Sequence, residues 1–420
     1  MNEEKRKLKN KTIWKTIRST REKRKNQHCR TYEIKINKSK LSREKKEHIE
    51  RLFLEGKWLW NHTVAQGDGL YSNRSPKTVY IKTSNGLEAR EFITLGSQMK
   101  QDIVDSVKTA IKALATIKSK GGKVGHVGYQ KYCNSIPLRQ YGNTYNIDFE
   151  NNTISIQGLV TPIKVSGLSQ IPNEADIANA KLIKKPSGLY FHITTYTEKE
   201  KRIPTGIVGA VDFGIKHTLT FDDGRVVDVC VPESRKIKSD QRKMNRQYSK
   251  NGKTKNHYKR IEKIRNGYEK NVNIKKDIAN KLVSKIFDTY DIFAIQDEMV
   301  SGWKSSIFGR IVQHSVMGRI KAKLKRNPRT KVVPKYFPST QKCPICGRNT
   351  RHPLEKRDYD CAFCGYHHNS RDQKSANMIL MEAMKQNVCV ERTAKSSAQA
   401  MASESQDAQA PLVCKPPPIG

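Results

Sequence analysis

The sequence predicts an α/β protein of several domains. Three observations lead to this prediction: segments of alternating polarity typical of strands, segments with apolar residues three or four apart typical of helices, and two close pairs of cysteines near the C-terminal end. The chain has 420 residues, enough for two to four domains of ~100 to 200 residues each. Each such domain is large enough to bury an apolar core.

The charge of the chain indicates a nucleic-acid partner. There are 80 Lys and Arg residues against 40 Asp and Glu, a formal net charge of +40. This excess suits a polyphosphate. A single DNA-binding module neutralises ~6 to 10 phosphates, so an excess spread along the whole chain indicates a long RNA or an extended duplex. A histone-like coating protein is the alternative.

Composition also bears on location and redox state. No stretch approaches the ~20 apolar residues of a membrane span, and the charged N-terminus lacks the apolar segment of a signal peptide. We therefore expect an intracellular protein of the cytoplasm. Nine cysteines, four of them paired in spacing, indicate metal ligands and reduced thiols rather than a disulfide framework.

The first half of the chain predicts a small β-barrel that carries a helical insertion. Residues 1–30 are dense in Lys and Arg, and we expect a basic arm that is disordered until it meets RNA or DNA. Residues 31–36 alternate as a half-buried strand does, and helices are predicted over 43–64 and 96–118. Short alternating segments separated by turn residues follow to residue 203. The predicted barrel comprises 31–42 and 129–203, and the helical insertion comprises 43–128.

The second half predicts a different sheet. A strand over 208–211 ends at Asp212, and two further strands meet at the hairpin signal Asp223-Gly224. A basic helical segment (234–269), a helix over 274–287, a strand over 292–295, a helix over 312–324 and a strand over 331–333 come next. This order is typical of an RNase H-like fold. We assign it residues 204–338 and 369–390, with a cysteine-containing insertion at 339–368 and a disordered tail at 391–420.

The cysteine motif is the strongest single signal. Cys343 and Cys346 are followed, after fourteen residues, by Cys361 and Cys364, and a glycine comes directly after each pair. Two such knuckles close a tetrahedral Zn²⁺ site. Four thiolates leave no open coordination position, so we assign this zinc to folding rather than to catalysis.

Several acids follow predicted strands or begin a helix. Asp212 ends the first strand of the second sheet, the segment Gln296-Asp297-Glu298 follows another strand, and Asp372 begins the last helix. Hydrolysis of a phosphodiester by two divalent ions needs carboxylates from separate elements that converge on the metals. A strand-terminal Asp is equally often a turn or cap residue, so the order of the acids is what gives them weight.

These motifs together resemble a known family. VDFG (211–214), QDE (296–298), the two cysteine pairs and SRDQKSAN (370–377) are similar to the split RuvC domain and zinc ribbon of the TnpB family. That family comprises transposon-associated RNA-guided nucleases and their descendants, the miniature type V-F CRISPR-associated effectors. Looser similarity upstream extends to the wedge barrel of the family and its inserted recognition helices.

The resemblance implies a catalytic triad that binds Mg²⁺. It places two members on Asp212 and Asp372. The third, a Glu that usually follows the apolar strand directly, meets Gln296 instead. Residues two apart in a strand point to the same side, and we favour Glu298 over Asp297 as the third acid.

The resemblance also implies the partners and the reaction. A guide RNA would pair with double-stranded target DNA beside a short adjacent motif, and the single RuvC site would cut both strands. We expect phosphate contacts from one set of cations: Lys236, Lys238, Arg242, Lys243, Arg246, Lys259, Arg260, Lys263 and Arg371. A homodimer on one guide RNA is favoured slightly over a monomer.

Two other functions stay open. Gln296 suits a nuclease-inactive, RNA-guided DNA-binding repressor, whereas the intact Asp212 and Asp372 argue against one. A transposon-associated strand transferase is the other alternative, although no motif demands recombination chemistry. The shared motifs do not distinguish a CRISPR effector from a transposon-encoded nuclease.

Overall fold

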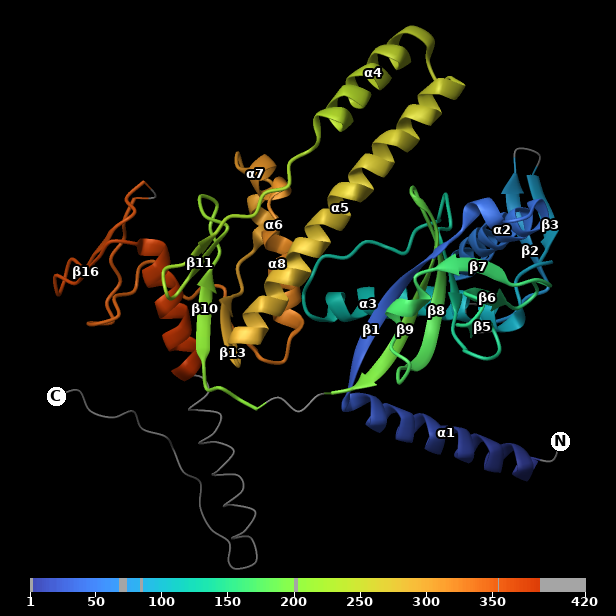
Figure 1. Ribbon diagram of the computed structural model, residues 1–420, viewed down its shortest axis with the longest axis horizontal. Helices are drawn as coiled ribbons and strands as arrows, with labels where there is room; N and C mark the ends of the chain where they lie inside the picture. The colour runs from blue at the N-terminus through green and yellow to red at the C-terminus, as the bar shows by residue number, and fades with distance from the viewer. Residues whose placement is uncertain (1–2, 68–73, 84–85, 200–202, 354, 386–420) are drawn as a thin grey trace, which may run out of the picture. The chain divides into compact units, whose positions relative to one another are not determined.

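The computed structural model describes residues 3–67, 74–83, 86–199, 203–353 and 355–385. The predicted disordered tail at 391–420 lies outside these residues. The chain divides into two compact units, Met1–Lys201 and Arg202–Gly420 (Figure 1). Each unit is described by itself below. Within the described residues, no helix combines the length and apolar character that crossing a bilayer requires.

The first unit is built on a seven-stranded sheet with strand order β4-β8-β9-β1-β7-β6-β5. Its long central strands pair antiparallel, and the buried side chains alternate along them as the sequence predicts. The strands are β1 (Gln27–Ile36), β4 (Ser135–Leu138), β5 (Tyr145–Asp148), β6 (Thr153–Ile156), β7 (Ile163–Ser166), β8 (Asp176–Lys185) and β9 (Gly188–Glu198). The short 3₁₀ helices η1 (Lys38–Lys40) and η3 (Leu168–Gln170) flank β1 and β7.

This sheet is partly barrel-like, in agreement with the predicted barrel. Its two ends, β4 and β5, are not paired with each other in the described residues. The edge strand β5 nevertheless reaches β8, because the hydroxyl of buried Tyr145 donates to the carbonyl of Ala178 over 3.1 Å. Ala178 lies where the β8–β9 register shifts. The β-bulge in β8 and the Tyr145 hydroxyl thus connect β5 to β8, two strands that are not paired in the sheet.

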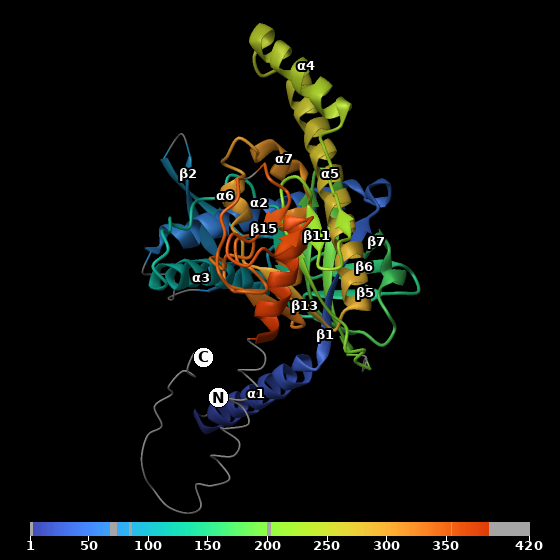
Figure 2. The ribbon, with the colours of Figure 1, turned by 90° about the vertical axis from the view of Figure 1, so that its left-hand side faces the viewer.

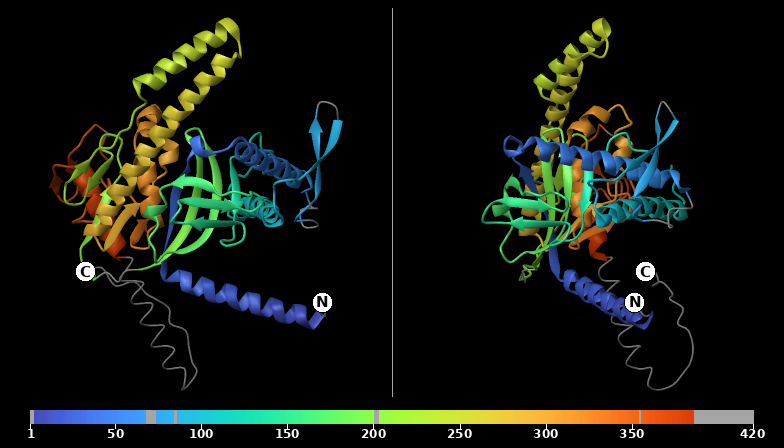
Figure 3. Two further views of the ribbon diagram at one scale, coloured as in Figure 1. Left: turned by 45° about the vertical axis from the view of Figure 1, so that its right-hand side comes forward. Right: turned by 90° about the vertical axis from the view of Figure 1, so that its right-hand side faces the viewer.

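Two helices are inserted between β1 and β4. They are α2 (Arg43–Ala65) and α3 (Ser97–Ser119), which lie side by side in Figure 3. The side chain of Ser42 caps α2 by accepting from the Lys45 amide. A hairpin of β2 (Thr78–Thr83) and β3 (Gly86–Glu91) comes between α2 and α3 in the sequence. It was not predicted because most of its side chains are exposed, so its sequence lacks a clear alternation.

A buried carboxylate fixes α2 to the start of α3. Glu55 accepts from the backbone amides of Ile93, Thr94 and Leu95, from the Thr94 hydroxyl, and from Arg51. Burial by itself would raise the pKa of Glu55. The hydrogen bonds outweigh that effect and hold the pKa below its ordinary value. The segment before α3 therefore depends on one ionised side chain.

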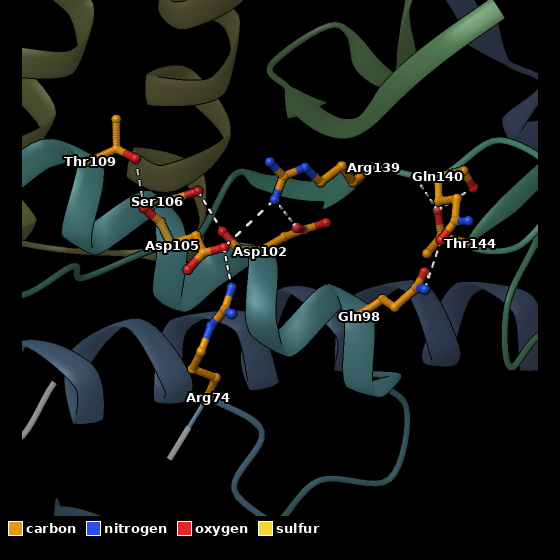
Figure 4. A network of polar contacts seen from close by, with 9 residues as sticks. All are labelled: Arg74, Gln98, Asp102, Asp105, Ser106, Thr109, Arg139, Gln140 and Thr144. Atoms are coloured by element: carbon orange, nitrogen blue, oxygen red, sulfur yellow. Dashed lines mark hydrogen bonds and ion pairs between the residues drawn. The ribbon is translucent and has the colours of Figure 1, made fainter. Parts of the chain in front are cut away.

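A second polar network ties α3 to the residues that follow β4 (Figure 4). Arg139 lies 3.1 Å from Asp102 and 3.6 Å from Asp105, and Arg74 pairs with Asp105. Gln98 donates to Gln140 over 2.7 Å. Asp102 is buried, and desolvation raises the pKa of its carboxyl despite the bond from Arg139. These contacts hold the helical insertion against the sheet.

The basic N-terminal segment is a helix rather than a disordered arm. Helix α1 (Glu3–Lys25) leads directly into β1, which begins four residues earlier than predicted. Lys23 pairs with Asp176 over 2.7 Å, and the Arg24 guanidinium lies 4.3 Å from the Tyr196 ring. The prediction of disorder missed these anchors because they come from β8 and β9, far away in the sequence.

The second unit contains a five-stranded sheet with order β12-β11-β10-β13-β14. Strands β10, β13 and β14 are parallel, whereas β11 and β12 are antiparallel to their neighbours. The strands are β10 (Val208–Asp212), β11 (Leu219–Phe221), β12 (Val226–Val227), β13 (Ile292–Gln296) and β14 (Thr330–Val333). All five coincide with predicted strands to within a few residues, and Gly224 takes the positive φ of the predicted β11–β12 turn.

Helices cover both faces of this sheet. Alternate strand residues Val211 and Ile295 pack on one face against α5 (Lys255–Thr289) and α8 (Met317–Arg326). Their neighbours Ala210 and Ala294 pack on the other face against a helix over 371–385. The small alanines allow this last helix to approach the sheet closely. The short helices α6 (Val300–Trp303) and α7 (Gly309–His314) precede α8.

Two helix predictions need correction. The chain breaks at Gly252, inside the predicted basic segment, and not between that segment and the apolar helix after it. Helix α4 (Arg235–Asn251) ends there, and one 35-residue helix, α5, contains the rest of the basic segment and the apolar helix. Helices α4 and α5 lie side by side in Figures 1 and 2. The single helix predicted over 312–324 is instead broken between α7 and α8 at Ser315. There the Val316 amide bonds to the carbonyl of Val229, a tertiary contact that competes with the helical bond.

Replacing Glu55 by Gln is expected to lower the free energy of unfolding by about 2 kcal/mol, because buried amides lose an ionised acceptor. The measurement is the urea midpoint followed by tryptophan fluorescence of the full chain, since Trp58 and Trp60 lie on α2. The difference in unfolding free energy between wild type and Glu55→Gln should become smaller in acid. The lowered pKa of Glu55 stabilises the folded protein at pH values above the ordinary glutamate pKa, and this stabilisation is lost as the pH falls through the pKa of Glu55 in the folded protein. Glu47→Gln, which removes an exposed pair with Arg43, is the control and should cost under ~0.5 kcal/mol. Equal losses in the two variants would contradict the role of Glu55.

Candidate metal sites and nucleic-acid interface

The four predicted zinc ligands meet in the second unit. All four Sγ atoms lie within 4.8 Å of one another, with Cys343 and Cys364 3.6 Å apart and Cys346 and Cys361 3.5 Å apart. Thiolates at ~2.3 Å from a tetrahedral Zn²⁺ would be about 3.8 Å apart. The donor set and its spacing are therefore compatible with a structural zinc.

Each cysteine pair forms the same local turn. The amides of Gly347 and Gly365 donate to the carbonyls of Cys343 and Cys361, both over 3.1 Å, and both glycines have φ near +70°. This left-handed backbone is what lets the chain fold back around an ion. Beside the pairs lie the short strands β15 (Tyr359–Asp360) and β16 (His367–His368).

Two histidines near the cysteines have other partners. His367 bonds to Asp360 and Asn369, and its hydrogen bond to Asp360 is the main reason that its pKa is raised. His368 accepts from the backbone amide of Ser370. Neither belongs to the set of mutually close ligand atoms. The cysteines are the ligands that the structure brings together.

The three predicted acids lie at one edge of the five-stranded sheet. Strands β10 and β13 are adjacent and parallel, with Val211 opposite Ile295, so Asp212 ends one strand beside the end of the other. Glu298 follows β13 by two residues, and Asp372 is the second residue of the helix over 371–385. The negative charges of Glu298 and Asp372 both act on Asp212.

Burial and mutual repulsion perturb this acidic cluster, defined as Asp212, Glu298 and Asp372. Desolvation, then repulsion by the other two acids, raises the pKa of Asp212 well above its usual range. Desolvation also raises the pKa of Glu298 to about 7, and its Oε2 atom is buried without a hydrogen-bond partner among the described residues. Asp212 is buried and repelled by the other two acids, and one oxygen of Glu298 has no partner, so these oxygen donors suit a divalent cation.

The carboxylates are not as tightly drawn together as the thiolates. Among the described residues, the cysteine set is the group of three or more such side chains whose ligand atoms all fall within 4.8 Å of one another. Asp372 is instead 3.8 Å from Arg357.

The structure separates the roles of the three residues after β13. Asp297 pairs with Lys325 over 2.8 Å and Lys321 over 3.4 Å on α8, and its pKa is lowered mainly by the bond from Lys325. Gln296 is buried and points elsewhere, as its amide donates to the carbonyl of Phe337 and accepts from the Ser339 hydroxyl. Glu298 is the member of this segment whose charge reaches Asp212.

Comparison with known proteins agrees with this geometry. Residues 191–305 match a family model described as a probable transposase (OrfB_IS605), and residues 315–379 match the Cas12f1-like TNB domain. The two matches support a TnpB/Cas12f-type family for this chain. The first match includes Asp212 and Glu298, and the second includes all four cysteines and Asp372. No curated protein matches the chain.

The hairpin of α4 and α5 carries eight of the nine cations that we expect to contact phosphates. Helices α4 and α5 project together beyond the sheet in Figure 1. All eight predicted cations of the hairpin are exposed or half-exposed: Lys236, Lys238, Arg242, Lys243, Arg246, Lys259, Arg260 and Lys263. Arg371 differs from them, because it is buried and donates to the carbonyl of Pro353. The structure therefore gives Arg371 an internal contact.

Lys374 was not predicted as a site residue, yet it connects the cysteine region to the acidic edge of the sheet. Its side chain is 1% exposed, donates to the carbonyls of Ser339 and Thr340, and lies 3.7 Å from the centre of the Tyr359 ring. Ser339 in turn bonds to Gln296. Lys374 lies inside the motif SRDQKSAN, but a basic chain offers no signal that this lysine is the buried one.

Zinc content provides a test of the cysteine site. We expect about one zinc per chain in wild type, and a large loss in Cys343→Ser and Cys361→Ser, because three thiolates hold zinc much more weakly than four. The measurement is metal analysis by mass spectrometry after dialysis. Cys230→Ser, an exposed cysteine outside the cluster, is the control and should retain the metal. Unchanged zinc in the two ligand variants would refute the assignment.

The acidic cluster predicts an unusual pH effect on stability. The pKa of Glu298 is raised to about 7 in the folded protein, so ionised Glu298 destabilises the fold. This destabilisation is absent below the ordinary glutamate pKa of ~4.3, grows as the pH rises to 7, and is complete above pH 7. Metal-free Glu298→Gln should therefore melt several degrees above wild type at pH 8 and much closer to it at pH 5. Asp297→Asn, whose carboxylate is paired, should not be stabilised at pH 8. Thermal melts that show the same Glu298→Gln difference at both pH values would contradict this account.

Proposed function

We propose that the protein is an RNA-guided, Mg²⁺-dependent DNA endonuclease with an RNase H-like, RuvC-type active site. The observation that carries the proposal is the meeting of Asp212, Glu298 and Asp372 at one edge of a sheet ordered β12-β11-β10-β13-β14. That order, with three parallel strands and an antiparallel hairpin, is the one expected for such a fold. Both family matches support a nuclease of this type.

The acidic cluster would hold Mg²⁺ through its carboxylate oxygens. Bound Mg²⁺ supplies the charge that activates a water molecule and stabilises the leaving oxygen of a phosphodiester. The chain itself fixes the positions of the acids. Lys321 donates to the backbone carbonyl of Glu298 and thereby holds the turn after β13, while Asp297 balances the lysine charge.

The residue Gln296 gives little support to an inactive site. Its amide is fully engaged with the loop after β14, so it holds this loop in place and leaves Glu298 as the acid beside Asp212. In this proposal, Gln296 is a positioning residue rather than a defective ligand. The repressor and the strand transferase remain outcomes that the experiment below distinguishes.

Recognition of the target would be divided between RNA and protein. The guide RNA would read sequence by base pairing, while the exposed cations of α4 and α5 contact phosphates of the guide or of its duplex with DNA. The ribbon of Cys343, Cys346, Cys361 and Cys364 would be held by zinc close to Asp372. Whether one copy or two hold the RNA follows from the mass of the purified complex.

Cleavage by the protein, co-expressed with its flanking genomic DNA to supply RNA, tests the proposal. With a matching DNA library and Mg²⁺, we expect Asp212→Asn and Glu298→Gln to cut more than about 100-fold more slowly than wild type, because each removes a metal ligand. Asp297→Asn should keep most activity, since that carboxylate faces α8. Guided binding without any cutting by wild type would favour the repressor, and joined DNA products would favour the strand transferase.

A further inference from the structure

The tip of the α4–α5 hairpin contains a polar hollow that the proposed cleavage site does not use. Its volume is about 420 Å³, within the range of small-molecule sites. Three cations and three carboxamides line it: Arg246, Gln247, Lys250, Asn251, Asn256 and Arg260. The lining combines positive charge with groups that both donate and accept hydrogen bonds.

Contacts between the two helices organise this hollow. The Gln247 amide donates to the Thr254 hydroxyl over 3.0 Å and accepts from Nε of Arg260 over 3.1 Å. The Thr254 hydroxyl also caps α5. Arg260 is 3.9 Å from Asp240, whereas Arg246 and Lys250 form no ion pair within the described part of the chain. The charges of Arg246 and Lys250 at the hollow are therefore available to an anionic ligand.

Two tyrosines lie within two residues, along the chain, of residues that line the hollow. Tyr248 and Tyr258 are 51% and 57% exposed, and buried His257 lies between them with ring centres 5.4 and 5.7 Å away. The buried His257 ring packs against both tyrosine rings and leaves a large part of each exposed to solvent. The tyrosine rings can stack on the flat face of a base.

We propose that the hairpin tip binds one unpaired nucleotide of the guide RNA. Arg246 and Lys250 would contact its phosphate, Asn251 and Asn256 its base edge, and Tyr258 its base face. This inference rests on the proposed function, because it takes the guide RNA as the partner.

The chemistry of the tip favours an unpaired nucleotide over a duplex. In an A-form duplex the base faces are stacked inside, so the two exposed tyrosine rings would have no base face to contact, although side chains can reach base edges and 2′-hydroxyls in the shallow minor groove. Tracking a duplex backbone needs cations alone. Single-stranded loops and bulges present all three features at once.

The test measures binding of the co-purifying RNA to zinc-containing protein variants without Mg²⁺ over a range of salt concentrations. We expect Asn251→Ala and Tyr258→Leu to weaken binding about tenfold without changing the salt dependence. Lys250→Ala should lower the slope of log K against log salt by about 0.7 to 0.9. Tyr258→Phe keeps the ring and should bind as wild type does. Lys285→Ala, on the same helix far from the tip, is the matched control for lost charge and surface.

A coupling experiment identifies the nucleotide. Ultraviolet crosslinking locates the RNA position at the tip, and an abasic nucleotide is then placed there. If the base is bound in the hollow, the losses from Asn251→Ala and from the abasic RNA are not additive, because both remove one contact. Fully additive losses would overturn the proposal, as would crosslinks to target DNA alone.

Other results separate this inference from the proposed function. Carboxamide and tyrosine variants that bind like wild type would overturn the nucleotide site, even if Lys250→Ala confirmed a phosphate contact and wild type cut DNA. The absence of any specific co-purifying RNA would overturn both. Normal RNA binding with no cleavage would refute the nuclease and leave the outcome at the tip to be decided by the coupling experiment alone.

Discussion

The parallel pairing of β10 with β13 is the constraint on which the candidate active site depends. With Val211 opposite Ile295, the two strands end at the same edge, and Asp212 and Glu298 are brought together from segments more than eighty residues apart. Parallel neighbours need a long crossover, and α4 and α5 provide it. The basic hairpin is therefore part of the connection that aligns the acids. One topological feature serves both the acidic edge and the cationic surface.

The acidic edge stores unfavourable electrostatics that the rest of the unit must offset. Burial raises the pKa values of Asp212 and Glu298, and repulsion by the other two acids adds to the effect at Asp212, so the protein without Mg²⁺ holds these groups in an environment that disfavours their charge. Packing on both faces of the sheet keeps them there, with the apolar side chains of α5 and α8 on one face and those of residues 371–385 on the other. Such strain is typical of sites where a bound cation restores the balance.

A chain of contacts also joins this edge to the cysteine cluster. Gln296 bonds to Ser339, Lys374 bonds to the Ser339 carbonyl, and the same lysine lies over Tyr359, two residues before Cys361. Each link is buried or half-buried, so the groups hold fixed positions relative to one another. The cysteine cluster is thereby mechanically connected to the end of β13. These few side chains thus link the cysteine cluster to the strand end that precedes Glu298.

The sequence alone determined the features that depend on neighbours along the chain. Cysteine spacing, strand alternation and helical periodicity are local, so the cysteine set, the strands of the second sheet and helices α2 and α3 were predicted to within a few residues. In the first sheet, β4 was not predicted. Tertiary structure decided the rest. The fold of α1, the break before α8, the buried positions of Arg371 and Lys374, and the separation of Glu298 from Asp297 each depend on partners from distant segments. A side chain's burial and charge environment are set by whatever packs against it, and no local pattern records that partner.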